Sequence, residues 1–124
     1  MAITLVLYSK VWTVEVLAEA EVELNAMPDR EQTAMHHAFD KLENEGPRLP
    51  SPHSSQVKGA GSLRELRPRQ GRSAWRAFYR RLGDTLVVAA IGPEAQSDRP
   101  GFDRAVRMAQ DRLQKRIDER GESG

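Results

Sequence analysis

The apolar positions at the start of the chain follow first a strand-like and then a helix-like spacing. Residues 11–17 (VWTVEVL) are rich in β-branched and aromatic side chains that largely alternate with polar ones, so they predict a strand. Residues 3–8 would extend this strand toward the N-terminus. Residues 18–27 (AEAEVELNAM) are strong helix formers up to the break at Pro28, which predicts a short helix.

A second helix and three further strands follow, separated by a long irregular segment. Apolar residues recur at helical spacing between Asp29 and the stop at Gly46, which predicts the helix. Residues 46–61 contain three prolines, three glycines and three serines and predict an irregular loop. Beyond it we expect three antiparallel strands and two glycine-containing tight turns. The strands are expected at residues 63–68, 73–81 and 85–91, and the turns at residues 69–72 and 82–84.

The end of the chain has the apolar spacing of one long helix, entered through the sequence SDRP at residues 97–100. The element order predicts an α+β domain over residues 1–118, with a polar tail at residues 119–124. We expect a small antiparallel sheet of about four strands, with two N-terminal helices and one C-terminal helix. The helices are expected to pack on one face of the sheet and to leave the other face open.

Size and composition fit one small domain without metal or disulfide cross-links. The chain has 124 residues, of which 39% are hydrophobic, and it contains no cysteine. The longest apolar run, residues 85–91, is far shorter than the roughly 20 residues of a membrane-spanning helix, and no secretory signal is visible. No glycine-rich phosphate loop, histidine metal cluster or Ser-His-Asp arrangement is present. These features favour a soluble, cytoplasmic protein that needs no cofactor or metal.

The net charge of +1 conceals an uneven distribution of charge along the chain. Residues 1–56 hold 4 basic and 9 acidic side chains, and residues 82–124 hold 7 and 8. The 25 residues between them, 57–81, hold 8 basic side chains and 1 acidic side chain. Such a local positive field attracts polyanions.

Strand alternation places several of these cations on one face of the predicted sheet. Arg76, Phe78 and Arg80 share one face of their strand, and Arg67 reaches the same surface from the neighbouring strand, close to the loop that carries Lys58. A planar guanidinium suits phosphate, and an aromatic ring beside it can stack on an unpaired base. The surface therefore fits single-stranded RNA, although ordinary solvated residues on an exposed sheet face would give the same pattern.

Four short motifs follow one another in a recognisable order. Residues 61–67 read GSLRELR, residues 75–79 read WRAFY, residues 83–84 are Gly-Asp before an apolar strand, and residues 104–107 in the last helix read RAVR. Together with the two upstream helices and the proline-containing loop, this layout resembles the RelE/HigB superfamily of toxins, and most closely its phage-derived HigB-like branch. The resemblance covers roughly residues 11–117.

This resemblance implies the toxin of a type II toxin–antitoxin system. Such toxins are metal-independent endoribonucleases that cleave ribosome-bound mRNA and so inhibit translation. A ribose 2′-hydroxyl attacks the adjacent phosphodiester, and the site must accept its proton, stabilise the charged phosphorane and help the 5′-oxygen leave. The implied partners are mRNA, the ribosome and a cognate antitoxin of helix-turn-helix type. No membrane contact and no sequence-specific DNA binding by this chain alone are expected.

The resemblance also assigns roles to residues of the basic segment. Arg76 matches the phosphate-binding arginine of the family, and Arg67 matches the basic residue that closes the ELR strand and supports the same phosphate. Lys58 is a candidate for substrate positioning or proton transfer. His53 is a further candidate base, although a solvated loop histidine is the simpler interpretation of it. Glu65 would orient the arginines through a salt bridge.

Further RNA contacts are expected from the same segment, at Arg64, Arg72, Phe78 and Arg80. In many active members of the family a tyrosine or histidine lies near the final helix, where this chain has Phe102, whose ring cannot transfer a proton. The alternative therefore remains a catalytically degenerate RelE-like protein that only binds an antitoxin or RNA.

Several other conspicuous residues have simpler interpretations. Trp75 and Tyr79 share the strand face opposite Arg76 and are expected in the core. His36 and His37 diverge by about 100° on their helix, so they cannot chelate one metal ion together, and both are expected at the surface or in an interface.

Overall fold

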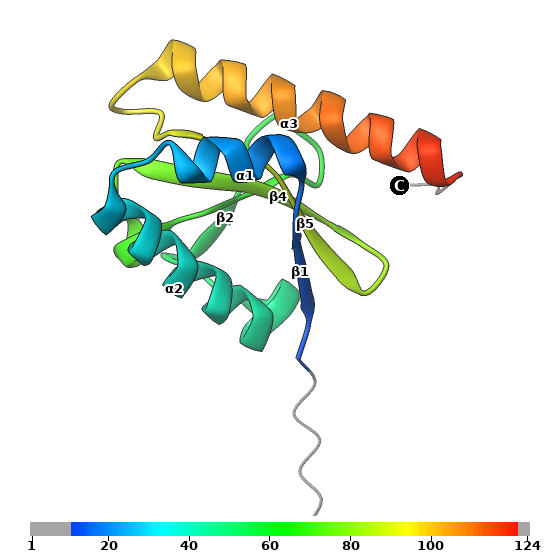
Figure 1. Ribbon diagram of the computed structural model, residues 1–124, viewed down its shortest axis with the longest axis horizontal. Helices are drawn as coiled ribbons and strands as arrows, with labels where there is room; N and C mark the ends of the chain where they lie inside the picture. The colour runs from blue at the N-terminus through cyan, green and yellow to red at the C-terminus, as the bar shows by residue number, and fades with distance from the viewer. Residues whose placement is uncertain (1–10, 122–124) are drawn as a thin grey trace, which may run out of the picture.

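The computed structural model describes residues 11–121, which form one five-stranded sheet with helices on both faces (Figure 1). The strands are β1 (Thr13–Val16), β2 (Ser54–Gln56), β3 (Arg64–Leu66), β4 (Trp75–Leu82) and β5 (Thr85–Pro93). The helices are α1 (Ala18–Asn25), α2 (Asp29–Glu45) and α3 (Arg99–Arg120), with short 3₁₀ helices η1 (Gly46–Arg48) and η2 (Pro68–Gly71). The predicted strand extension at residues 3–8 and the end of the polar tail, 122–124, lie outside the described residues.

The sheet has the order β1-β5-β4-β3-β2, in which β1 runs parallel to β5 and the other neighbours are antiparallel. The predicted α+β class, with two N-terminal helices and one C-terminal helix, is confirmed. The sheet has five strands instead of about four, because β2 forms inside the segment expected to be an irregular loop and pairs with β3. Helix α3 continues through Arg120, so it includes the first part of the predicted polar tail.

The two predicted tight turns have different outcomes. Strands β4 and β5 are joined directly across Gly83 and Asp84, with Gly83 at a φ of 62°, as a tight hairpin requires. The tight turn predicted at residues 69–72 is wrong. Strand β3 ends before Pro68, which cannot donate a ladder hydrogen bond, and the connection to β4 contains η2.

One hydrophobic core lies between the sheet and helices α1 and α2. It contains the fully buried Met35 and Leu42 of α2 against Leu66, Ala77 and Tyr79 of the sheet. Trp75 is half-buried against this core, so the predicted core face of β4 is confirmed. Within residues 11–121 no helix has the length and apolar character needed to cross a membrane.

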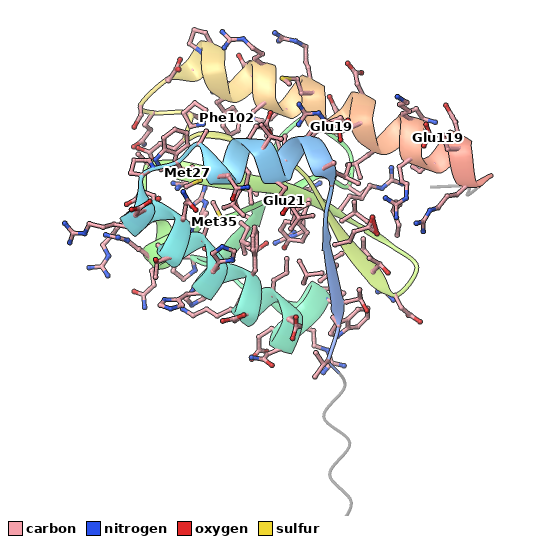
Figure 2. The ribbon with its side chains drawn as sticks, viewed as in Figure 1. Glu19, Glu21, Met27, Met35, Phe102 and Glu119 are labelled. Carbon is pink, nitrogen blue, oxygen red and sulfur yellow. The ribbon has the colours of Figure 1, made fainter. Side chains whose placement is uncertain are left out.

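A second core occupies the opposite face of the sheet, beneath α3 (Figure 1). Phe78 of β4 is 0% exposed, and its ring packs edge-on against Phe102 at a centroid distance of 5.3 Å. Phe102, labelled in Figure 2, lies at the start of α3. Leu113 and Ala109 of α3 continue the contact along the helix.

The expectation that one face of the sheet remains open is therefore wrong. Residues 86–91 of β5 are apolar at every position and all are buried, so this strand needs a cover on both faces. The apolar stripe of α3 supplies the second cover. The continuous apolar run was the signal in the sequence, because a strand with one solvated face alternates instead.

Gly92 sets how closely α3 approaches β5. A Cβ atom at this position would lie 2.5 Å from the Cβ atom of Ala105 and 3.5 Å from the ring of Phe78. We expect Gly92→Ala to lower the free energy of unfolding by about 1–3 kcal/mol, because α3 must shift to accommodate the methyl group. Urea denaturation measures this. The double variant with Ala105→Gly should recover part of the loss, and a fully stable single variant would contradict the close approach.

Candidate active site

The structure brings Arg67 and Arg76 together around one carboxylate, that of Glu65. Glu65 on β3 lies opposite Phe78 on β4, so its side chain points to the same face of the sheet as Arg76. Its Oε1 atom accepts a hydrogen bond of 2.7 Å from Nε of Arg67 and lies 3.6 Å from Nε of Arg76. The Glu65 carboxylate thus holds both guanidinium groups at one end of the β3–β4 pair.

Arg76 is anchored much more strongly than Arg67. Its side chain is only 5% exposed, and both terminal nitrogens already donate hydrogen bonds within the protein. Nη1 donates to the carbonyl oxygens of Ser73 and Trp75, at 2.6 Å and 2.9 Å. Nη2 donates to the Gly71 carbonyl at 3.3 Å and to Oε2 of Glu94 at 2.9 Å. The Arg67 side chain, by contrast, is 33% exposed.

Burial is the main influence on the ionisation of Arg76. Desolvation lowers the pKa of its guanidinium from the ordinary value, and the carboxylates of Glu65 and Glu94 partly offset this effect. A guanidinium stays protonated at any physiological pH, so the side chain remains a cation in a largely dry position. Its two carboxylate partners keep that buried charge compensated.

A cavity of about 320 Å³ opens beside this group of charges. Its lining residues are Glu65, Arg67, Gly71, Arg76, Glu94, Ala95 and Gln96. Two cationic and two anionic side chains therefore face the same space. A phosphate entering it would meet Arg67 directly, whereas at Arg76 it would compete with Glu94.

Glu94 is a residue of this site that sequence reasoning did not identify. Its backbone N–H donates to the Ala74 carbonyl at 2.9 Å, which places it immediately after β5 and next to the start of β4. Its Oε1 atom accepts a hydrogen bond of 2.6 Å from Oγ of Ser97, and its side chain is 23% exposed. The sequence did hold one signal for Glu94, which is that it directly follows an apolar strand. A residue at the end of one strand lies beside the ends of the neighbouring strands, here the start of β4.

The two candidates for proton transfer lie outside this cavity. Lys58 is exposed in the connection between β2 and β3, at the end of β3 that is remote from Arg67. The carbonyl oxygen of His53 accepts a hydrogen bond of 2.8 Å from the backbone N–H of Arg67. Its half-buried side chain lines a separate, smaller cleft, which Arg67 also lines.

The four predicted RNA-contacting residues occupy different environments. Arg64 is half-buried and donates from Nε to Oγ of Ser54 at 3.0 Å, and Arg72 is exposed. Arg80 lines a groove of about 250 Å³ between the β2–β3 connection and α3. Phe78 lies beneath α3 and has no exposed ring face, so the expectation that it stacks on an RNA base must be corrected. Phe102 belongs to the same core contact.

The described residues contain no group of three histidine, cysteine, aspartate or glutamate side chains that could hold a metal ion. The charged side chains that line the cavity offer guanidinium and carboxylate groups. Guanidinium groups can bind a phosphate and stabilise negative charge that develops on it, and carboxylates can orient them or accept a proton.

The fold is the RelE fold. It is similar to a chain of the toxin–antitoxin complex RelBE2 from Mycobacterium tuberculosis, with 22% identity, a TM-score of 0.54, and coverage of 68% of this chain and 99% of that chain. It is similar to an arginine-to-alanine double mutant of Escherichia coli toxin RelE in the free state, with 14% identity, a TM-score of 0.57, and coverage of 78% and 96%. It is also similar to a chain of the archaeal RelE-RelB complex from Pyrococcus horikoshii OT3, with 20% identity, a TM-score of 0.51, and coverage of 67% of this chain and 94% of that chain.

The family is defined more narrowly than the fold. The model of the family Phage derived protein Gp49-like (DUF891) matches residues 22–92, more than half of the chain, so the chain belongs to this family. The predicted membership of the phage-derived branch of the RelE/HigB superfamily is thereby confirmed. A search of the curated proteins found no match.

Proposed function

We propose that this protein is the toxin of a type II toxin–antitoxin pair, a cytoplasmic endoribonuclease that cleaves ribosome-bound mRNA and is inhibited by an antitoxin of helix-turn-helix type. Membership of the Gp49-like family supports the proposal, as do the folds of RelBE2 and of the archaeal RelE-RelB complex. The observation that carries it is the pairing of Arg67 and Arg76 around Glu65 at the edge of an open cavity.

The proposed reaction is metal-independent transesterification of the RNA backbone. The 2′-hydroxyl attacks the adjacent phosphorus, its proton passes to a base, the bond to the 5′-oxygen breaks, and that oxygen takes up a proton. The products are a 2′,3′-cyclic phosphate and a 5′-hydroxyl. Negative charge on the phosphorane is greatest in the transition state, so fixed cations beside it lower the barrier.

The two arginines have unequal parts in this proposal. Arg67 is one-third exposed and lines the cavity, so it is the cation that contacts the scissile phosphate. Arg76 lies behind it, with its hydrogen-bond donors occupied, and contributes positive charge and the orientation of Glu65 and Glu94. His53 adjoins Arg67 through the neighbouring cleft and is the nearer of the two proposed proton-transfer residues, Lys58 being the other.

We expect Arg67→Ala to reduce mRNA cleavage by about tenfold to hundredfold. Removing a fully preorganised donor of an oxyanion hole costs roughly a hundredfold to a thousandfold, and a partly solvated guanidinium stabilises charge less strongly. Primer extension on mRNA after induction, and on a purified translation reaction, measures cleavage and its phasing with the reading frame. Urea denaturation of the same variant should show a loss of no more than about 1 kcal/mol in the free energy of unfolding, because the Arg67 side chain is 33% exposed and the buried Glu65 carboxylate keeps Arg76 at 3.6 Å.

Arg104→Ala is the matched control, because it removes an exposed arginine from α3, away from the cavity. It should cleave like the wild type. Equal cleavage by the Arg67 and Arg104 variants would reject Arg67 as the phosphate ligand. Absence of ribosome-phased cleavage by the wild type would reject the enzymatic proposal itself.

A non-catalytic binding protein is the second candidate function, and one observation favours it. Glu65 and Glu94 neutralise both arginines of the cavity, and Phe102 is buried in the core instead of offering a titratable group. Under this alternative the wild-type protein copurifies with a coexpressed antitoxin but neither arrests growth nor cleaves mRNA. Growth arrest with phased cleavage excludes it.

A further inference from the structure

A second, smaller cleft lies on the other side of Arg67, between α2 and the end of β3. Its floor is apolar, formed by small or aliphatic side chains of α2, β3 and the segments next to them: Ala34, Ala38, Leu49, Leu66 and Pro68. Its rim carries His37 and Lys41 from α2, His53, Arg67, and Arg69 from η2. The volume of about 30 Å³ accommodates a group the size of a water molecule. The cleft is therefore too small for a nucleobase.

The rim of this cleft is basic throughout, and part of it has no partner inside the protein. His37 and Lys41 are four residues apart, so they project from the same side of α2. Within residues 11–121, no hydrogen bond or ion pair engages the side chain of Lys41, His37 or His53. No acidic residue lines the cleft. Arg67 and Arg69 are ion-paired with Glu65 and Glu31, so the uncompensated positive charge at the rim is that of Lys41, which an external anion can compensate.

The cavity beside Arg76 has the opposite character. There Glu65 and Glu94 face Arg67 and Arg76, so the charges of the lining side chains balance. An anion that binds at this cavity gains less from the local field than one bound at the rim of the cleft. The tighter anion-binding position of the two is expected at the cleft.

Arg67 connects the two spaces because it lines both of them. A polyanion with one phosphate at the Arg67–Arg76 cavity therefore has the cleft next to it, on the other side of the Arg67 side chain. Arg69 is held in this position by a left-handed backbone, with a φ of 56°, followed by Gln70 at 59°. Its Nη2 atom lies 3.4 Å from Oε2 of Glu31 on α2, which fixes η2 against the helix beside the cleft.

We propose that the rim formed by His37, Lys41, His53, Arg67 and Arg69 is a second phosphate-binding position for single-stranded RNA, next to the scissile phosphate. This inference rests on the proposed function, because it extends the path of the same RNA strand. The phosphate oxygens contact the cations at the rim, and the base of that nucleotide stays outside the cleft. The residues of the rim that belong to the cleft alone, His37, Lys41 and Arg69, increase affinity for RNA and align the strand, and they take no part in the chemical step.

The test uses oligonucleotides of 2′-O-methyl nucleotides, which lack the attacking hydroxyl and cannot be cleaved. Fluorescence anisotropy gives Kd for a dinucleotide, with one internucleotide phosphate, and for a strand of about six nucleotides, over a series of salt concentrations. We expect Lys41→Glu to weaken binding of the longer strand about three- to tenfold and to lower the magnitude of its salt slope by about 1. The dinucleotide, whose single phosphate occupies the tighter position at the cleft, should be weakened by a similar factor.

Lys115→Glu is the matched control, since Lys115 is exposed on α3, far along the chain from the cleft, and its reversal changes the net charge by the same amount. It should bind the longer strand like the wild type. Cleavage by the Lys41 variant should show a raised KM with an unchanged kcat, as expected for a group that binds ground state and transition state equally.

Equal affinity and equal salt slope for the Lys41 and Lys115 variants would overturn the proposal, as would a wild-type protein that does not bind the longer strand. A Lys41 variant that loses only its antitoxin would show that the cleft serves an acidic protein segment instead, and would also overturn it. Each of these outcomes leaves ribosome-phased cleavage by the wild type intact. Failure of the inference is thus distinguishable from failure of the proposed function.

Discussion

Arg76→Ala is expected to lower the free energy of unfolding by about 3–5 kcal/mol, the usual cost of removing one partner from a buried ion pair. The substitution leaves the carboxylate of Glu94 and the carbonyl oxygens of Gly71, Ser73 and Trp75 without their hydrogen-bond donor. Small domains are stable by only about 5–15 kcal/mol, so a loss of this size is a large fraction of the total stability. Urea denaturation followed by tryptophan fluorescence measures the change.

Arg67→Ala is the matched comparison, because it removes the same residue type from the same network where the side chain is one-third exposed. It should lose no more than about 1 kcal/mol. If the Arg76 variant is as stable as the wild type and has lost cleavage, the anchoring role is wrong and direct phosphate binding by Arg76 is favoured. Loss of growth arrest in the Arg76 variant alone therefore does not identify a catalytic residue, whereas the same loss in the stable Arg67 variant does.

Phe78→Ala is expected to have an effect of similar size, about 3–5 kcal/mol, because it opens a cavity in the core beneath α3. The ring is fully buried and packs against Phe102. For a domain of this size we expect the midpoint of thermal unfolding to fall by about 10–20 °C. Differential scanning calorimetry provides both the midpoint and the enthalpy.

The conservative variant Phe78→Leu separates the core role from base stacking. It keeps most of the buried volume, so it should be much less destabilised, and it should bind single-stranded RNA as tightly as the wild type. Val22→Ala, at a position that is 69% exposed on α1, is the control for an apolar truncation outside the core and should change stability by less than about 0.5 kcal/mol. A folded Phe78→Leu protein with several-fold weaker RNA binding would restore the stacking role.

Local patterns along the chain were sufficient to predict most of the elements. The strand at β1, the helices α1, α2 and α3 and the β4–β5 hairpin all follow from apolar spacing and from glycine and proline positions. Strand β2 could not be predicted in this way. Its three residues, SSQ, have no apolar alternation and become a strand only because β3 offers an edge for pairing.

The candidate site was only partly predictable, for reasons that differ between residues. The basic segment and the pattern of the family pointed to Arg67, Arg76 and Glu65, and strand pairing brings these three together. Glu94 was not assigned, because its contact with Arg76 joins residues 18 positions apart, at the open end of the β4–β5 hairpin. The basic cleft beneath α2 combines Lys41 with Arg69, and only the packing of η2 on α2 makes them neighbours.

The sequence by itself determined which segments form helices and strands, that the positive charge lies in residues 57–81, and that the motifs are those of the RelE/HigB superfamily. These are properties of neighbouring residues and of short spacings. Only the tertiary structure decided that α3 covers the second face of the sheet, that Phe78 is core, and that Arg76 is enclosed by carboxylate and carbonyl groups while Arg67 stays accessible. The physical reason is that strand alternation assigns a side chain to a face, whereas burial depends on what packs on that face, and that requires contacts between distant segments.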